Sequence, residues 1–255
     1  MSLLSTDALS VSIAGRAICQ SLTLGLGAGQ CWGMLGSNGA GKTTLLHTLA
    51  GLRAPAAGSV LVEGCRMTTM TRRQIARVLG LLPQDNVDPF PATVLETALI
   101  GRHPHLSAWQ RERTEDVAIA RAALADVELD RLLQRQVDTL SGGERRRLAL
   151  ATLFTQQPRV WLLDEPTNHL DLRFQIKLLG LMQDKAAEQN SVVLMSLHDV
   201  NLAARFCHAI MLLFPDGTIA HGPVQTMLTA GNLQRLYGYP VTMVAGPAGP
   251  VFVPG

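Results

Sequence analysis

The sequence predicts an α/β fold, in which a parallel sheet with a phosphate-binding loop follows an antiparallel β part and is interrupted by a helical insert. Three observations predict it. The pattern G-x-x-x-x-G-K-[ST] occupies residues 36–43, between a short apolar strand and a helix. Two continuous apolar segments, residues 159–163 and 191–197, end in polar residues, which is typical of buried parallel strands beside a ligand site. Residues 86–157 carry helix signals and no strand candidate.

Length and composition limit the class of protein. The chain has 255 residues, 47% of them hydrophobic, which is sufficient for one large domain with an inserted subdomain. A net charge of +2 gives no strong basic field, and no nucleic-acid partner is expected. The four cysteines form no C-x-x-C pair and are expected to be reduced, mostly buried thiols of a cytosolic protein. No apolar run approaches the ~20 residues of a membrane span, and no signal peptide is expected.

The first 85 residues are expected to form mainly strands. A turn at residues 14–16 lies between two β-rich segments, which predicts an antiparallel hairpin. The phosphate loop needs a strand before it and a helix after it, and Gly51 and Pro55 end that helix. The predicted elements are strands at 9–13, 22–24 and 30–35, a helix at 42–49, a strand at 58–64, a helix at 71–77 and a strand at 78–82.

Helices dominate the middle of the chain before the α/β pattern resumes. Two capping boxes, at residues 93–96 and 141–144, mark helix starts, and Gly101 and Pro158 mark helix ends. A Pro-Asp-Gly turn at 215–217 predicts a second hairpin. The predicted elements are helices at 93–101, 113–126 and 141–157, a strand at 159–163, a helix at 172–188, and strands at 191–197, 209–214 and 218–221.

The loop at residues 36–43 is expected to bind a triphosphate, because the free amides at the start of the following helix form an anion site. Lys42 is expected to reach the β and γ phosphates, and Thr43 to ligate magnesium. Only three of the 22 basic residues are lysines, and a compact ammonium suits a phosphate cradle better than a guanidinium. The expected nucleotide-binding residues of the loop are Gly36, Ser37, Asn38, Gly39, Ala40, Gly41, Lys42, Thr43 and Thr44.

Polar residues at the ends of three predicted strands are the candidate catalytic groups. Asp164 is expected to hold the magnesium shell, and the adjacent Glu165 to orient and deprotonate the attacking water. Gln84 is expected to contact the metal or the water, and His198 to hydrogen-bond the γ-phosphate. A solvated loop glutamine and a structural histidine are the alternatives for these last two residues.

A second glycine-rich helix start occurs at Ser141, Gly142, Gly143 and Glu144. Two successive glycines at the first positions of a helix weaken it by roughly 1 kcal/mol each, so a cap alone does not account for them. Amides without a neighbouring Cβ can approach a phosphate closely. Because one loop of this chain already cradles phosphates, a second anion site on the insert suggests ATP shared between two chains.

Taken together, these motifs resemble those of ABC-transporter ATPase subunits, in the same order and over nearly the whole chain. They are the phosphate loop, Gln84, residues 140–144, 160–165 and 168–171, and His198. The resemblance implies a single ABC ATPase domain with a P-loop NTPase core at 1–85 and 158–255 and a helical subdomain at 86–157. It implies ATP and Mg²⁺ as cofactors and a head-to-tail homodimer with two sandwiched ATP molecules. In that dimer Ser141, Gly142 and Gly143 act on the partner's nucleotide, and Asp171 lies in the loop at the interface.

A narrower likeness concerns the ATPases of bacterial importers for heme, ferric siderophores and cobalamin. It lies at residues 82–84, 90–91, 94, 101–105, 236–238 and 251–254. This likeness implies transmembrane permease subunits, a separate substrate-binding protein, and a peripheral location on the cytoplasmic face of the inner membrane. His103 and His105 are expected to be solvated loop residues, because the cargo of such importers never meets the ATPase.

Departures from the family pattern occur at Ile13, Glu144 and His169. Ile13 stands where the family commonly stacks an aromatic ring on adenine, so weak stacking and little discrimination between ATP and GTP are expected. Glu144 replaces a usual glutamine, and His169 a usually small residue. The alternatives are a soluble ABC-type ATPase acting on ribosomes or DNA, an exporter ATPase and a P-loop kinase. The chain has no heptads or second ATPase half to favour the first and no acceptor site to favour the kinase, whereas only the importer-like residues argue against the exporter. Residues 240–255 receive no functional prediction.

Overall fold

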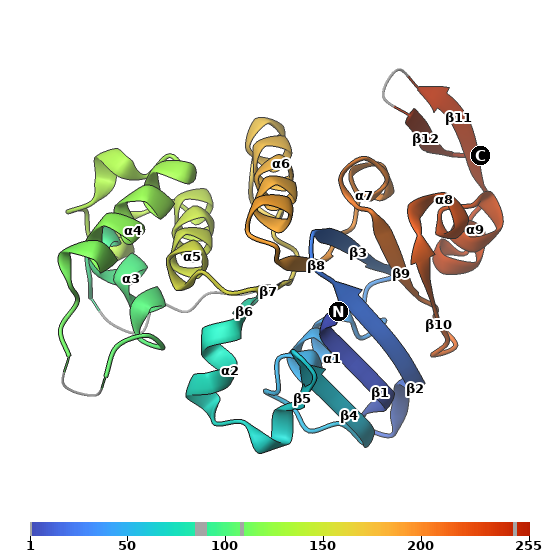
Figure 1. Ribbon diagram of the computed structural model, residues 1–255. Coiled ribbons are helices and arrows are strands. Elements are labelled where there is room, and N and C mark those ends of the chain that lie inside the picture. Colours follow the sequence, from blue (N-terminus) through green and yellow to red (C-terminus); the bar gives the residue numbers. More distant parts are fainter. Residues whose placement is uncertain (1, 85–90, 108–109, 247–248) are drawn as a thin grey trace.

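A six-stranded sheet, in the order β10-β9-β3-β8-β7-β6, forms the centre of the protein (Figure 1). Its neighbouring strands are parallel except for β9 and β10, which form the predicted hairpin. The strands are β3 (Gln30–Gly36), β6 (Leu79–Leu82), β7 (Val160–Leu163), β8 (Val192–Ser196), β9 (Ala209–Leu213) and β10 (Ile219–Pro223). This computed structural model describes residues 2–84, 91–107, 110–246 and 249–255.

Both faces of the central sheet are buried, which explains why its strands read as continuous apolar segments. In β7, Val160 and Leu162 belong to one hydrophobic core, whereas Trp161 and Leu163 belong to the other. The first core includes residues of the antiparallel sheet, of α1 (Lys42–Leu49) and of α2 (Arg72–Val78), and the second packs against the remaining helices. With both faces covered, only the strand ends remain for polar side chains.

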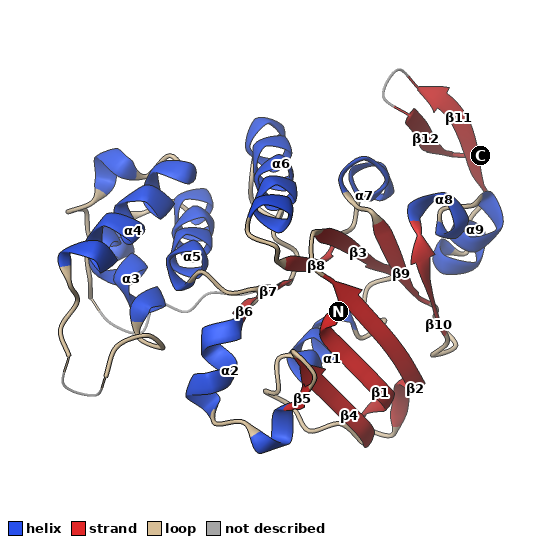
Figure 2. Ribbon diagram, in the orientation of Figure 1, coloured by secondary structure: helices blue, strands red, loops and turns tan. Residues whose placement is uncertain are grey.

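The N-terminal hairpin belongs to a four-stranded antiparallel sheet, in the order β2-β1-β4-β5 (Figure 2). Its strands are β1 (Ser2–Ile13), β2 (Arg16–Gly27), β4 (Ala57–Val62) and β5 (Cys65–Arg66). The prediction of a hairpin is confirmed, but both strands are longer than predicted. Register shifts along β1 break the strict alternation of apolar and polar residues, so the sequence pattern covers only part of each strand.

Three α-helices form the insert: α3 (Val94–Leu99), α4 (Thr114–Asp126) and α5 (Gly142–Gln156). Within residues 91–107 and 110–157 the structure has no named strand, as predicted. Both predicted capping boxes are present, at Thr93 with Glu96 and at Ser141 with Glu144. Of the importer-like residues 90–91, Phe90 lies outside the described residues.

Helix α2 (Arg72–Val78) precedes β6, and α6 (Leu172–Glu188) matches the predicted helix. The sequence did not predict the short helices α7 (Val200–Phe206), α8 (Val224–Met227) and α9 (Ala230–Tyr237), nor a C-terminal hairpin of β11 (Val241–Gly246) and β12 (Gly249–Pro254). These segments are too short for a clear period, and tertiary packing holds them. Phe252 of β12, for example, is buried, and its amide and carbonyl bond the Asn201 side chain of α7.

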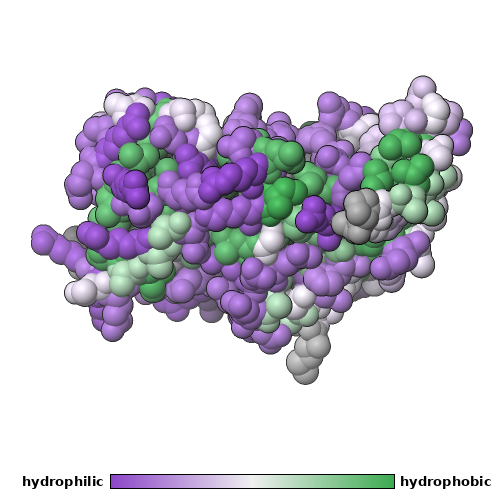
Figure 3. Space-filling view, turned by 90° about the horizontal axis from the view of Figure 1, so that it is seen from above, coloured by the Kyte–Doolittle hydropathy of each residue, from purple (hydrophilic) through white to green (hydrophobic). Residues whose placement is uncertain are grey.

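The surface has two further features. Figure 3 shows apolar groups gathered at the end of the molecule that carries the C-terminal hairpin, where Met243, Val244 and Val253 are exposed. Among the described residues, no helix combines the length and apolar character that crossing a membrane requires. All four cysteines are free thiols; only Cys65 is exposed, and burial raises the pKa of Cys31 to about 12.

Candidate functional site

A cavity of about 620 Å³ lies where four parallel strands end. The loop after β3, Gln84 after β6, Glu165 after β7 and His198 after β8 all contribute to its lining. These strands are neighbours in the sheet, so groups up to 160 residues apart in the sequence meet at one edge. Of the predicted loop residues, positions 38–44 line the cavity.

Lys42 lies inside this loop and is almost fully buried. Its Nζ donates to the carbonyl of Gly36 at 2.8 Å and to that of Ser37 at 3.3 Å, so these two residues orient the lysine. Gly36 and Ser37 themselves do not line the cavity. Burial lowers the pKa of Lys42, while the charges of Glu165 and Asp164 oppose that shift. The ammonium is therefore placed close to both carboxylates.

Gly41 shows why the loop needs glycine. Its φ is +98°, and a Cβ built on it would lie 2.6 Å from the side chain of Ile18. Any other residue would be strained in its backbone and would collide with Ile18. The loop can thus pass close to β2, with helix α1 beginning at the next residue.

Asp164, next to Glu165 in the sequence, is completely buried and does not line the cavity. Its Oδ1 accepts a hydrogen bond from Ser196 Oγ at 2.6 Å, whereas its Oδ2 has no hydrogen-bond partner among the described residues. Ser196 Oγ also accepts the backbone N–H of Glu165 at 2.7 Å. Ser196 was not among the predicted site residues, although it is a polar residue near the end of a predicted strand.

Glu165 lines the cavity with a carboxylate that two side chains orient. Its Oε1 lies 2.6 Å from Nε2 of His198, and its Oε2 accepts a hydrogen bond from Asn168 Nδ2. The backbone of Glu165 has φ +48°, in the left-handed region that non-glycine residues rarely adopt. Such strain is typical of functional sites. In this structure His198 thus contacts the carboxylate that was expected to act as the base.

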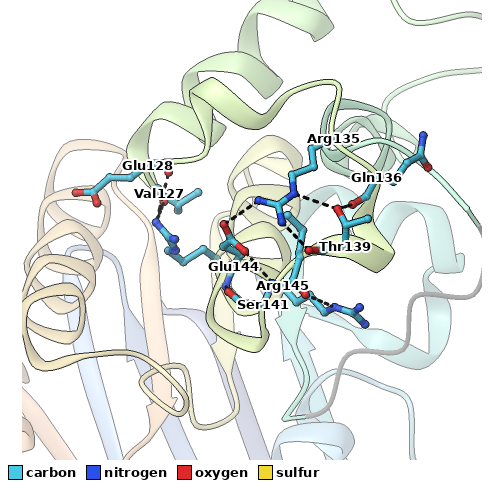
Figure 4. Close-up of polar contacts among 10 residues, drawn as sticks. Val127, Glu128, Arg135, Gln136, Thr139, Ser141, Glu144 and Arg145 are labelled. Carbon is cyan, nitrogen blue, oxygen red and sulfur yellow. Dashed lines mark hydrogen bonds and ion pairs between the residues drawn. The ribbon is translucent and has the colours of Figure 1, made fainter.

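The glycine-rich start of α5 does not line the cavity. Figure 4 shows its polar contacts. Ser141 Oγ accepts from the N–H of Glu144 at 3.3 Å, and Glu144 Oε2 accepts from the N–H of Ser141 at 2.8 Å. That backbone donor is the main reason why the pKa of Glu144 is lowered, and Arg135 adds an ion pair at 3.5 Å. Glu144 therefore completes the capping box with Ser141.

Three further predicted residues also lie away from the cavity lining. No described atom lies within 4 Å of a Cβ built on Gly142, and a Cβ on Gly143 would lie 3.2 Å from the His169 carbonyl. Asp171 caps α6, where its Oδ1 accepts from the N–H of Phe174 at 2.8 Å. Within one chain, the structure does not bring these residues to the phosphate loop.

Arg146 is a buried residue of the site that the sequence analysis did not identify. It lies on α5 and donates to backbone carbonyls at the ends of β6 and β7. Since it is the middle one of three consecutive arginines, nothing in the sequence distinguishes it.

Ile13, Arg16 and Ile18 of the N-terminal hairpin form another wall of the cavity. Ile13 is 40% exposed, and the lining contains no phenylalanine, tyrosine or tryptophan. The described lining therefore offers an aliphatic and cationic wall in place of an aromatic ring.

A phosphate loop beside a buried aspartate and an oriented glutamate defines the class of P-loop ATPases. The sequence model of the family described as ABC transporter matches residues 19–168. The chain belongs to the ABC transporter family. It is an ATPase of this family, and the prediction of the ABC ATPase fold is confirmed.

The similar proteins include ATP-binding proteins of importers. The chain is 38% identical to the hemin import ATP-binding protein of Burkholderia ambifaria, over 99% of this chain and 100% of that protein. It is 33% identical to the iron(3+)-hydroxamate import ATP-binding protein of Bacillus subtilis, over 97% of this chain and 92% of that protein. A solved metal-chelate type ABC transporter, in an inward-facing conformation, matches with a TM-score of 0.86 and 29% identity, covering 100% of this chain and 98% of that one.

Proposed function

We propose that this chain is the ATP-hydrolysing subunit of a membrane importer whose cargo is heme, an iron-siderophore or cobalamin. The observation that carries the importer assignment is the extent of the similarity. Import ATP-binding proteins match 97% and 99% of the chain, which is nearly its whole length. The soluble, exporter and kinase alternatives have no comparable support.

The phosphate loop and Lys42 bind the triphosphate. The N-terminus of α1 directs free amides toward the loop, and the cavity wall from Asn38 to Thr44 provides room for phosphate oxygens. Lys42 Nζ is held beside the loop by its hydrogen bonds to the Gly36 and Ser37 carbonyls. The side chain therefore needs little rearrangement to contact the β and γ phosphates.

Mg²⁺ fits the chemistry of the residues around Asp164. A buried carboxylate oxygen without a hydrogen-bond partner is suited to bind a cation, and Asp164 Oδ2 is such an atom among the described residues. Asp164, Thr43 and Gln84 would hold the ion together with phosphate oxygens. Bound Mg²⁺ neutralises charge on the phosphates.

Glu165 orients and deprotonates the attacking water. Its carboxylate faces the cavity, and the contacts with His198 and Asn168 restrict its rotation. A fixed base near the phosphate loop reduces the reorganisation that proton abstraction requires. His198 therefore orients the base, and it remains on the cavity wall, where it can also meet the γ-phosphate.

A second copy of the chain completes each nucleotide site. Ser141, Gly142 and Gly143 lie at the N-terminus of the 15-residue helix α5, and open space surrounds Gly142. This helix end is an anion site that no phosphate of its own chain reaches. In a head-to-tail homodimer it meets the partner's ATP, and Asp171 lies in the interface loop.

The dimer works with transmembrane permease subunits and, in the full system, a separate substrate-binding protein. It lies peripherally on the cytoplasmic face of the inner membrane and does not bind nucleic acid. Gentle detergent purification of the tagged chain from its own cell, with mass spectrometry of the bound proteins, tests this. A polytopic permease in near-equal amount is the expected result, whereas ribosomal proteins or DNA without a membrane protein would contradict the proposal.

Two variants test the chemistry. Glu165→Gln is expected to bind ATP but to lose turnover by about 100-fold or more, because the general base is gone. Lys42→Ala is expected to impair ATP binding itself. Near-normal hydrolysis by Glu165→Gln would remove Glu165 from the mechanism.

A further inference from the structure

Three consecutive arginines follow the cap of α5, and they reach in different directions. Arg145 donates to the carbonyls of Leu140 at 3.2 Å and Asp138 at 2.7 Å, in the segment that precedes its own helix (Figure 4). Arg147 donates to the carbonyls at residues 127 and 128 of the insert, and its guanidinium lies 5.4 Å from the ring centre of Phe174.

Arg146 instead reaches the central sheet, and it is only 3% exposed. Its Nη1 donates to the carbonyls of Pro83 at 2.6 Å and Gln84 at 3.1 Å. Its Nη2 donates to the carbonyls of Asp164 at 2.6 Å and Glu165 at 2.8 Å. A rigid planar guanidinium can hold four acceptors in one arrangement, which an ammonium on a flexible stem cannot. One side chain of the insert thus fastens the two segments that carry Gln84 and Glu165.

The backbone at Glu165 needs such support. With φ +48° it occupies a conformation that a side chain disfavours, and it persists only where surrounding bonds hold it. The N–H of Glu165 is bonded to Ser196 Oγ, and its carbonyl accepts from Arg146 Nη2 and, at 3.2 Å, from the N–H of Asn168. Since the backbone conformation sets the direction of the side chain, these bonds determine where the carboxylate points.

We propose that Arg146 is a positioning residue for ATP hydrolysis, whose bonds to the Asp164 and Glu165 carbonyls fix the direction of the Glu165 carboxylate. The inference rests on the proposed role of Glu165 as the base. It also implies that a displacement of α5, which carries the glycine-rich helix start, moves the backbones of Gln84 and Glu165 together.

The test compares Arg146→Gln and Arg146→Lys with Arg147→Gln as a matched control. The control removes one arginine from the same helix without touching the ends of β6 or β7. For the purified full chain with Mg-ATP, kcat, KM and the Kd for ATP are measured. Arg146→Gln is expected to lower kcat about 10-fold to 100-fold, the effect of losing hydrogen bonds from a charged group, with KM and Kd changed less than about twofold.

The two remaining variants make the test specific. Arg146→Lys keeps the charge but loses the planar guanidinium, and it is expected to lower kcat by about tenfold or less. If Arg146→Gln does not fold, the kcat of Arg146→Lys tests the proposal in its place. Arg147→Gln is expected to keep kcat within about twofold. A Kd for ATP that weakens while kcat stays unchanged, or equal losses at Arg146 and Arg147, would overturn the proposal.

A double-mutant cycle with Glu165→Gln separates this inference from the proposed function. If Arg146 acts through Glu165, Arg146→Gln should add no further loss to the residual rate of the Glu165→Gln variant. An additive loss would show that Arg146 does not act through the base. Near-normal turnover of Glu165→Gln alone would instead refute the role of Glu165 itself.

Discussion

Replacing Ser196 with alanine is expected to destabilise the protein much more than removing another buried serine. The Ser196 hydroxyl donates to Asp164 Oδ1 at 2.6 Å and accepts from the N–H of Glu165 at 2.7 Å. Losing a hydrogen bond to a charged group costs about 1.5–3 kcal/mol, and leaving a buried N–H without an acceptor costs about 1–3 kcal/mol. Because the two losses share one site and are not additive, about 3 kcal/mol is expected.

Ser191 provides the matched control. It is as buried as Ser196, but its Oγ donates to the Lys185 carbonyl at 3.0 Å, a neutral acceptor. Ser191→Ala should therefore cost only about 1 kcal/mol. Urea unfolding of both variants, followed by circular dichroism and compared at constant m-value, measures the difference. Equal losses in the two variants, or a loss below about 1 kcal/mol for Ser196→Ala, would refute the reasoning that the Asp164 carboxylate depends on this hydroxyl.

Three other outcomes are expected. Hydrogen bonds from Arg173 and then Lys177 lower the pKa of Glu128 from 4.5 to about 2. As the pH falls, Glu128 is therefore protonated in the unfolded chain before it is protonated in the folded chain. Solvent reaches all three side chains, so the stabilisation is at most about 1 kcal/mol; it is present above pH 4.5 and is lost as the pH falls toward 2. The Tm difference between wild type and Glu128→Gln should shrink over that range, and an unchanged difference would contradict the assignment. Ellman's reagent should label one thiol of the native chain, Cys65, and four after denaturation; labelling of two or more native thiols would mean that the cores open readily. ATP and GTP should compete for the site about equally. Ile13→Tyr should tighten ATP binding about fivefold or more, since stacking on a base contributes about 1 kcal/mol or more. A large preference of the wild type for ATP would contradict the expectation that the aliphatic wall stacks weakly on the base.

Local signals predicted those elements whose residues interact with near neighbours in the sequence. The capping boxes at Thr93 and Ser141 depend on residues three positions apart, and both are present. The buried strands β7 and β8 read as continuous apolar segments because both of their faces are covered. The phosphate loop requires its glycines locally, at Gly41 through its φ of +98°.

Elements held by distant partners escaped prediction. Helices α7 to α9 and the C-terminal hairpin are short, and they are placed by contacts such as that between Asn201 and Phe252. Likewise, the pairing of β1 with both β2 and β4 extends the first strand to Ser2 through irregular registers that leave no clean alternation. No window of the sequence contains the partners of these residues.

By itself, the sequence determined the phosphate loop, the acidic pair Asp164 and Glu165, the fold class and the family, because each of these is written in contiguous residues or in their order. Only the tertiary structure decided how the groups at the strand ends act on one another. The contact of Glu165 with His198 and the hydrogen bond from Ser196 to Asp164 join the ends of β7 and β8, which the parallel register of the sheet brings together. Arg146 reaches the end of β7 from the insert. The chemistry of the side chains is enough to identify candidate site residues, whereas their distances and hydrogen-bond partners depend on how the chain packs.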